Sequence, residues 1–325
     1  MASTRFGRCV VFACLVVVAQ GHVEFEAWKR SEGRSYGGAD EEKARRVYAQ
    51  NRAVVDALNS DADDGAVYAL NRFGDADAAG FAAKWLMPKR SAPKFPPERY
   101  AVASSRANSN AFDWRDFNAT TPVQDQGALG SCWAFSATQN VEGQRFLRDG
   151  LLEALSVEQI LECDAGVDEA QSRADCGEFG GWPYLALGYV IKAGGLRTAA
   201  EMPYCAGGAS GLCSERGGVS VKSWAAFSQD EALLADALAS TGPLSVAMNA
   251  LTLQFYRSGI FNPRFCEAAS LDIAVLLVGF GVDAGKPYWT VKNSWGEKWG
   301  EDGYFRIARG SGKCGINSNA VSAIL

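Results

Sequence analysis

The chain has 325 residues, of which 48% are hydrophobic and 21% charged, and its formal net charge is −5. These values are typical of a globular protein of one or two domains. The acidic balance gives no electrostatic basis for binding nucleic acid or anionic membranes, so neither is expected as a partner.

The first 21 residues have the pattern of a secretory signal peptide. Arg5 and Arg8 precede an apolar run over residues 9–19, and small residues follow at Ala19 and Gly21. The run is too short to span a bilayer comfortably, and no other apolar run approaches about 20 residues. We therefore expect cleavage after Gly21, no transmembrane helix, and delivery to the extracellular space, a lysosome or a vacuole.

Residues 23–86 have the spacing of a helical, charged region. The Gly-rich stretch 31–40 should separate a first helix from a longer second one. Residues 88–110 contain Pro93, Pro96 and Pro97 among many Ser and Ala, which predicts an extended, exposed and cleavable linker. The apolar positions with helix-like spacing are Phe25, Trp28, Val47, Tyr48, Val54, Val55 and Leu58.

The stretch 126–135 combines a tight loop with the predicted start of a helix. Gly127 and Gly130 allow the loop, Ser131 is placed to cap the helix, and Cys132 lies in its first turn. A helix N-terminus has free N–H groups and a positive dipole end, so this position favours a thiolate, the nucleophilic form of cysteine. Gln126 could direct an amide N–H at a developing oxyanion.

Further elements follow this helix in chain order. A short helix is predicted over 155–163 with Ser156 as its cap, and 180–183 should open a third helix. Strands are predicted over 244–248, 274–280, 288–292 and 304–308. Helices first and strands later indicate an α+β protein with two lobes. Asn118 begins an Asn-Ala-Thr glycosylation sequon.

The cysteine count indicates disulfides and one free thiol. Cys9 and Cys14 lie in the signal peptide, which leaves an odd number in the remaining chain. Cys132 is the expected free thiol because of its motif. A zinc site built from Cys163, Cys176, Cys205 and Cys213 is not expected, since no pair has C-x-x-C spacing, and no other cofactor is expected.

Four segments in the right order resemble the papain family of cysteine proteases: 110–115, 126–135, 271–275 and 288–296. The resemblance implies the papain-like fold, with a helical lobe, a β-barrel lobe and a cleft between them. It implies a helical inhibitory prosegment with its linker over residues 22–107 and a peptidase domain over 108–325. The prosegment signatures are matched at Tyr48, Asn51, Val55, Asn59, Asn71, Phe73 and Asp75, with departures at Asp40, Ala44 and Ala69.

The resemblance also assigns roles to single residues. Cys132 would be the nucleophile, Gln126 the oxyanion donor and Asn293 the residue that orients the catalytic histidine. It pairs Cys163 with Cys213 and Cys266 with Cys314. The first position of the family's third bridge is Leu129, so that bridge cannot form, and a Cys176–Cys205 bridge is left open as a replacement. The substrate-binding residues would be Gly180, Gly181, Trp182, Ala247, Leu271, Asp272, Ala274 and Trp295.

The family's catalytic histidine position holds Ile273, and the one histidine of the chain is His22. Asp272 cannot replace the base, because neighbours on a strand point to opposite faces. The first hypothesis is therefore a papain-like cysteine peptidase homologue, monomeric and inactive or strongly impaired. The second is a secreted decoy that binds peptides or cystatin-like inhibitors in a retained cleft. The third is a secreted scaffold with no cleft function.

Overall fold

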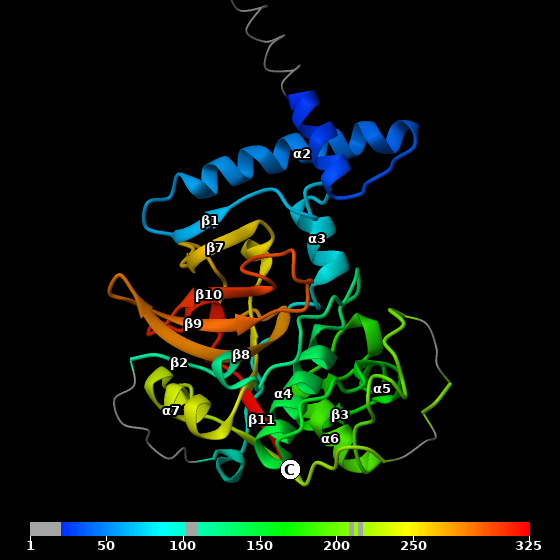
Figure 1. Ribbon diagram of the computed structural model, residues 1–325, viewed down its shortest axis with the longest axis vertical. Helices are drawn as coiled ribbons and strands as arrows, with labels where there is room; N and C mark the ends of the chain where they lie inside the picture. The colour runs from blue at the N-terminus through cyan, green and yellow to red at the C-terminus, as the bar shows by residue number, and fades with distance from the viewer. Residues whose placement is uncertain (1–20, 102–109, 208–210, 214–216) are drawn as a thin grey trace, which may run out of the picture.

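The computed structural model of the protein describes residues 21–101, 110–207, 211–213 and 217–325. We call residues 21–101 the N-terminal segment and residues 110–325 the two-lobed domain. The helices of the N-terminal segment lie across one end of the two-lobed domain (Figure 1). The predicted signal peptide falls outside the described residues, except for Gly21. Within the described parts of the chain, no helix combines the length and apolarity needed to cross a membrane.

The helical lobe is organised around one central helix, α4. This helix is buried from Cys132 to Gly143, because it packs against β8 on one side and against α5 and α6 on the other. The predicted Ser156 cap is confirmed: its hydroxyl accepts a hydrogen bond of 3.0 Å from Gln159 N. The helices of the two-lobed domain are α4 (Cys132–Asp149), α5 (Val157–Cys163), α6 (Pro183–Ala193) and α7 (Glu231–Thr241).

A nine-stranded sheet forms the second lobe, in the order β1-β7-β10-β9-β8-β6-β11-β5 with β2 paired to β8. The strand predictions are confirmed, and two of them coincide with β6 and β10. The strands are β1 (Gly65–Tyr68), β2 (Phe112–Asp113), β5 (Ser223–Ala226), β6 (Leu244–Met248), β7 (Tyr256–Phe261), β8 (Ile273–Asp283), β9 (Lys286–Lys292), β10 (Tyr304–Ala308) and β11 (Ala320–Ile324). A separate hairpin joins β3 (Val167–Asp168) to β4 (Arg173–Ala174).

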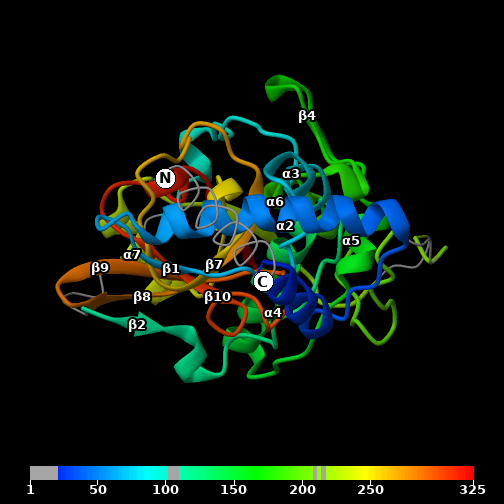
Figure 2. The same cartoon turned by 90° about the horizontal axis from the view of Figure 1, so that it is seen from above.

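The N-terminal segment contains a helix over residues 21–31, α2 (Gly38–Asn59), β1 and α3 (Ala78–Trp85). Figure 2, seen from above, shows α2 crossing the top of the molecule. The sequence did not predict β1, which is too short for a period-two pattern to be recognised. This strand pairs antiparallel with β7, so the segment extends the sheet of the two-lobed domain.

The prediction that residues 88–110 form an extended, exposed linker is confirmed only in part for residues 90–101. Most of these residues are exposed, but Pro93 is buried, and a 3₁₀ turn over Pro97–Arg99 interrupts the extended backbone. Arg90 forms an antiparallel bridge with Leu271, and Tyr100 forms a parallel bridge with Ala226. The stretch therefore lies in solvent on one side and is attached to the two-lobed domain on the other. Residues 102–109 lie outside the described residues.

An aromatic cluster fastens the N-terminal segment to the two-lobed domain. The ring of Phe73 lies 5.0 Å from Phe81, 5.0 Å from Trp85 and 5.4 Å from Trp295, measured between ring centroids. Phe73 and Phe81 are both fully buried. Aromatic rings bury large apolar areas and prefer these edge-to-face contacts, so this cluster is a main source of docking energy.

We predict that Phe73→Ala lowers the free energy of unfolding of the full chain by about 3–5 kcal/mol, because it leaves a cavity between three rings. Chemical denaturation followed by tryptophan fluorescence measures this. Phe265→Ala is the matched control, since Phe265 is 82% exposed, and it should change the value by no more than about 0.5 kcal/mol. Equal effects of the two substitutions would contradict the assignment of Phe73 to the docking core.

Candidate active site

Cys132 begins α4 and is fully buried. The N–H of Ala274, in β8, points at its sulfur with an N···S distance of 3.4 Å. The start of a helix favours a thiolate, but a cysteine without an imidazole partner is expected to stay mostly protonated, and the burial of Cys132 agrees with the second expectation. Burial raises the pKa of the Cys132 thiol to about 12, and backbone N–H groups at the helix start offset only part of that effect.

Ser131 occupies the N-cap position of α4, but its hydroxyl does not cap the helix. Its Oγ instead lies 3.0 Å from the Oη of Tyr204, and that phenol donates to the carbonyl of Gln126 at 2.7 Å. Tyr204 therefore connects the loop before the helix to the helix start. Nothing in the spacing of the sequence indicated this contact, because the two segments are far apart along the chain.

The side chain of Gln126 is held at both ends and is fully buried. Its Oε1 accepts from Ser294 Oγ at 2.6 Å. Its Nε2 donates to the carbonyl of Leu129 at 2.5 Å and to the carbonyl of Trp85 at 3.2 Å. Trp85 belongs to the N-terminal segment, so that segment already occupies the amide that would face a developing oxyanion.

Asn293 has an unsatisfied amide. Its Oδ1 accepts from Ser294 N at 2.8 Å, but its buried Nδ2 has no hydrogen-bond partner among the described residues. Ile273 is the first residue of β8 and is fully buried. Its side chain offers no hydrogen-bond acceptor to that Nδ2. His22 lies in a hollow beside α2, lined by residues of the N-terminal segment.

Gly180 and Gly181 form a wall of the site at which neighbouring side chains leave no room for a Cβ atom. A Cβ on Gly181 would lie 2.5 Å from a ring carbon of Trp133, and a Cβ on Gly180 would lie 3.1 Å from Met87 Cβ. Gly180 also has a φ of 115°, which disfavours any side chain. Met87 comes from the N-terminal segment, which therefore runs directly along the Gly180–Gly181 wall.

The predicted apolar pocket residues are all buried. Trp182, Ala247, Leu271 and Ala274 are at most 1% exposed, and Ala247 is paired with Ala274 in the register of β6 and β8. The N-terminal segment forms backbone hydrogen bonds with Leu271 and with its neighbour Asp272. Leu271 exchanges hydrogen bonds of 2.8 and 2.9 Å with Arg90, and the carbonyl of Asp272 accepts from Met87 N at 2.8 Å.

The carboxylate of Asp272 is engaged inside the protein. It accepts from Ala250 N at 2.7 Å and from Asn249 Nδ2 at 3.2 Å. Burial raises its pKa to about 7, and the hydrogen bond from Ala250 opposes this rise. The Asp272 carboxylate therefore binds residues that follow β6 in the sheet lobe.

Trp295, the last predicted substrate-binding residue, is covered as well. The Phe81 ring lies 5.4 Å from the Trp295 ring. Arg72 forms an ion pair with Asp125 and donates to the carbonyl of Trp295 at 3.1 Å. The contacts of Trp85, Met87 and Arg72 were not anticipated, because Trp85 ends α3, the other two residues lie outside any helix or strand, and none of them forms part of a periodic pattern.

A pair of buried aspartates supports the Gly180–Trp182 wall from behind. Asp175 Oδ1 accepts from Trp182 N at 2.6 Å, and Asp164 Oδ1 accepts from Gly166 N at 2.7 Å. The second oxygen, Oδ2, of each carboxyl group is buried and has no hydrogen-bond partner among the described residues. Burial raises the pKa of both groups, and their mutual repulsion raises that of Asp175 further, so the pair holds a proton.

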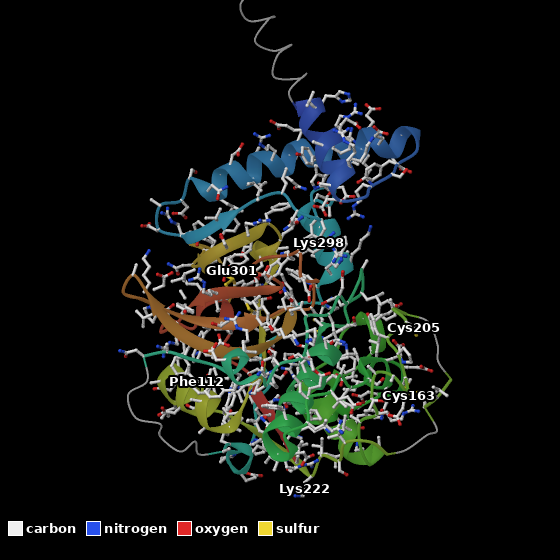
Figure 3. The ribbon with its side chains drawn as sticks, viewed as in Figure 1. Phe112, Cys163, Cys205, Lys222, Lys298 and Glu301 are labelled. Atoms are coloured by element: carbon white, nitrogen blue, oxygen red, sulfur yellow. A yellow bond between two sulfur atoms is a disulfide. The ribbon has the colours of Figure 1, made fainter. Side chains whose placement is uncertain are left out.

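Two disulfides join the pairs Cys163–Cys213 and Cys266–Cys314. Cys176 is exposed and carries a free thiol, so the Cys176–Cys205 bridge left open by the sequence is not formed in this structure. Cys163 and Cys205 both lie in the helical lobe (Figure 3). The side chains of Leu129 and Glu178 both lie close to Gly207. Glu178 therefore lies near Leu129, the position that would hold a cysteine in the family's third bridge.

The described residues include no group of three or more His, Cys, Asp or Glu side chains arranged to hold a metal ion. The polar groups that the structure gathers at the site are the thiol of Cys132, the amides of Gln126 and Asn293, and nearby backbone N–H groups.

Two family models match the chain. The model described as "Papain family cysteine protease" matches residues 108–324, and the model described as "Cathepsin propeptide inhibitor domain (I29)" matches residues 25–81. "Cysteine proteinase 15A" of Pisum sativum is 36% identical over 306 residues, covering 90% of this chain and 84% of that protein. "Digestive cysteine proteinase 3" of Homarus americanus is 36% identical over 326 residues, covering 95% and 96%.

A solved structure shows the same arrangement of segment and lobes. Digestive procathepsin L 3 of Tenebrio molitor larval midgut superposes with a TM-score of 0.80 and 31% identity, covering 94% of this chain and 99% of that chain. The predicted α+β fold, with two lobes preceded by a helical segment, is confirmed.

We predict that Cys132 in the intact chain reacts with iodoacetamide at pH 7.5 at least about 10²-fold more slowly than Cys176, because its thiol is buried and its pKa is raised. Peptide mass spectrometry over time measures both rates in one sample. Because the thiolate fraction of Cys132 grows until the pH passes about 12, any labelling of this residue should still increase between pH 8 and 10. Equal rates for the two cysteines would contradict the burial of Cys132.

We predict that stability of the intact chain falls as the pH rises from about 5 to 8, in part because of the Asp164–Asp175 pair. Raised pKa values mean that the folded state binds a proton that the unfolded state releases above about pH 4, so deprotonation costs stability. Asp175→Asn should reduce this dependence by at least about 1 kcal/mol, because its amide can donate to Asp164 without a proton. The exposed Asp302→Asn is the control, and an unchanged slope in Asp175→Asn would disprove the role of the pair.

Proposed function

Because this chain belongs to the papain family of cysteine proteases, we propose that Ile273 occupies the position of the family's catalytic histidine and that the protein hydrolyses peptide bonds poorly or not at all. Residues 108–325 are then the homologue of the peptidase domain, residues 22–107 its inhibitory prosegment with linker, and residues 1–21 its secretory signal. The matches over 108–324 and 25–81 support this division.

The observation that carries the proposal is the environment of Cys132. Ala274, the residue after Ile273, donates its N–H to the Cys132 sulfur, so Ile273 lies at the nucleophile. The amide of Asn293, which would hold an imidazole in place, has a buried Nδ2 without a partner among the described residues. Such an unsatisfied donor costs about 1–3 kcal/mol. An imidazole that accepts the thiol proton at one ring nitrogen donates from the other, so its partner here would be Asn293 Oδ1, which accepts from Ser294 N instead.

The chemical consequence of this substitution is large. In a Cys/His pair the imidazole accepts the thiol proton and later protonates the leaving amine. General acid–base catalysis of this kind contributes about 10²–10⁴-fold, and the members of a catalytic unit act together. Ile273 can supply neither step, and the nearby carboxylate of Asp272 is engaged by Ala250 and Asn249.

A second candidate function is binding without catalysis. Gln126, Cys132, Asn293 and Trp295 remain in place although the base is missing, and the pocket of Trp182, Ala247, Leu271 and Ala274 is apolar. A cleft that keeps this geometry could hold an extended peptide with a bulky apolar second side chain, or a cystatin-like inhibitor, once the prosegment leaves. As a secreted decoy, the protein would be monomeric and require no cofactor.

The secretory route is supported by the two disulfides and by the exposed sequon. Asn118 is solvent-exposed and has a φ of 55°, at the end of a 3₁₀ turn outside the cleft. We infer that it carries an N-linked glycan and that the protein reaches the extracellular space, a lysosome or a vacuole.

We predict that Ile273→His raises Cys132-dependent peptidase activity at least about 10²-fold over the wild type, because it restores the base and gives Asn293 its partner. Wild type, Ile273→His and Cys132→Ala versions of both are treated with a trimming protease to remove the prosegment. They are then assayed on a fluorogenic peptide with a bulky apolar second residue.

Two outcomes decide between the two candidate functions, an impaired peptidase and a non-catalytic decoy. Robust turnover by the wild type that disappears in Cys132→Ala would show that the proposal about Ile273 is wrong. A folded Ile273→His variant without activity would point to wider decay of the cleft. In that case, saturable binding of a cystatin-like inhibitor by the trimmed wild type would support the decoy function.

A further inference from the structure

Residues 90–101 of the N-terminal segment occupy a second groove, outside the cleft that contains Cys132. Its walls are the β3–β4 hairpin, Tyr184 of α6 and the strand β5. The sequence predicted a free linker here, so the contacts are unexpected. They resemble the contacts of a bound peptide: a backbone that is extended except for one 3₁₀ turn at Pro97–Arg99, aromatic anchors and pairing at a strand edge.

The β3–β4 hairpin holds the first part of this stretch. Arg90 donates to the carbonyl of Ala174 at 3.3 Å, and Arg173 donates to the carbonyl of Ala92 at 3.2 Å. The backbone N–H of Lys94 donates to Gln171 Oε1 at 2.7 Å. Since the hairpin accepts from and donates to the backbone, these contacts do not depend on the side chains of the bound residues 92 and 94.

Two side chains of the stretch fill specific positions. The ring of Phe95 lies 5.2 Å from Tyr184 and 5.2 Å from Trp224, edge to face with both. The guanidinium of Arg99 lies 4.5 Å from the centroid of the Trp224 ring and donates to the Trp224 carbonyl at 3.4 Å. Aromatic pairs and cation–π contacts of this kind give selectivity for an aromatic residue followed by arginine.

The last part of the stretch extends the sheet. β5 is the final strand in the sheet order, so its outer edge has free N–H and C=O groups. Tyr100 pairs in parallel with Ala226, and Ala101 N donates to the Ala226 carbonyl at 2.9 Å. Any extended peptide could form the same main-chain hydrogen bonds.

The groove continues into an open hollow of about 570 Å³ that shares Tyr184 and Trp224 with the Phe95 position. Asp164, Asp168 and Glu169 line this hollow, and Lys192 is its one basic residue. Asp168 already accepts from Tyr184 and Gln171, whereas Glu169 is exposed. The surplus of acidic groups favours a ligand with basic side chains.

We propose that this groove is a peptide-binding exosite, which takes a segment of another protein that carries an aromatic residue, a single turn, and an arginine four positions after the aromatic residue. Residues 90–101 are its internal ligand and must withdraw before the other segment binds. Binding here uses neither Cys132 nor Ile273, so the exosite does not rest on the proposed loss of catalysis and is tested separately from it.

The test uses the full chain with its internal ligand weakened, Phe95→Ala/Arg99→Ala. The probe is a fluorescent synthetic peptide of residues 89–101, and binding is followed by anisotropy. We expect the peptide to bind this variant at least about tenfold more tightly than it binds the wild type, whose groove is filled. Adding Trp224→Ala, or using a probe peptide with Phe95→Ala, should weaken binding by at least about tenfold.

Phe265→Ala/Arg257→Ala is the matched control, because it removes the same side chains from exposed positions outside the groove. It should bind the peptide no better than the wild type does. The proposal is overturned if Phe95→Ala/Arg99→Ala binds no better than this control, or if Trp224→Ala leaves the binding intact.

Hydrogen exchange on the single variant Trp224→Ala gives a second measurement that does not depend on the folding of the double variant. In the wild type, the amides of Lys94 and Ala101 should be protected. Trp224→Ala should speed their exchange at least about tenfold while the amide of Ala274 stays protected. Unchanged exchange at Lys94 and Ala101 would also overturn the proposal.

Discussion

The site depends on the burial of one thiol between two backbones. The N–H of Ala274 approaches the sulfur of Cys132 from β8, and the N-terminal segment excludes water from the cleft. A thiolate in such a place needs a positive partner, because desolvation penalises the charged form. Ile273, the residue before Ala274, supplies no such partner, so the neutral thiol is the stable form. The apolar side chain of Ile273 suits these surroundings well.

The N-terminal segment uses polar groups of the cleft for its own docking. The carbonyl of Trp85 accepts from Gln126, and Met87 and Arg90 form main-chain hydrogen bonds with Asp272 and Leu271. These hydrogen bonds between the segment and the cleft form whether or not the protein can hydrolyse a peptide bond. In a chain without a catalytic base, selection would still preserve the geometry of the cleft as long as the segment must dock there, so retention of the cleft alone does not imply catalysis.

Local rules predicted the regular elements well, and tertiary packing decided the rest. The Ser156 cap and the strands β6 and β10 follow from residue types and their periods. Ser131 has the residue type of a cap, but Tyr204, which is distant in sequence, engages its hydroxyl. The thiolate expected at Cys132 rested on the helix dipole, an effect of about 0.3–1 kcal/mol that full burial outweighs. The Asp164–Asp175 pair is likewise set by tertiary contacts that spacing does not reveal.

The two ends of the large sheet have a common feature. At one end β1 pairs with β7, and at the other Tyr100 and Ala101 pair with β5, so the N-terminal segment covers the outer strand of the two-lobed domain at both ends. An uncovered strand edge is a template for pairing with another chain. A molecule that lost the segment would expose two such templates at once, and it would be prone to assemble through them. The segment thus protects the colloidal stability of the folded protein, and this role persists even when there is no active enzyme to inhibit.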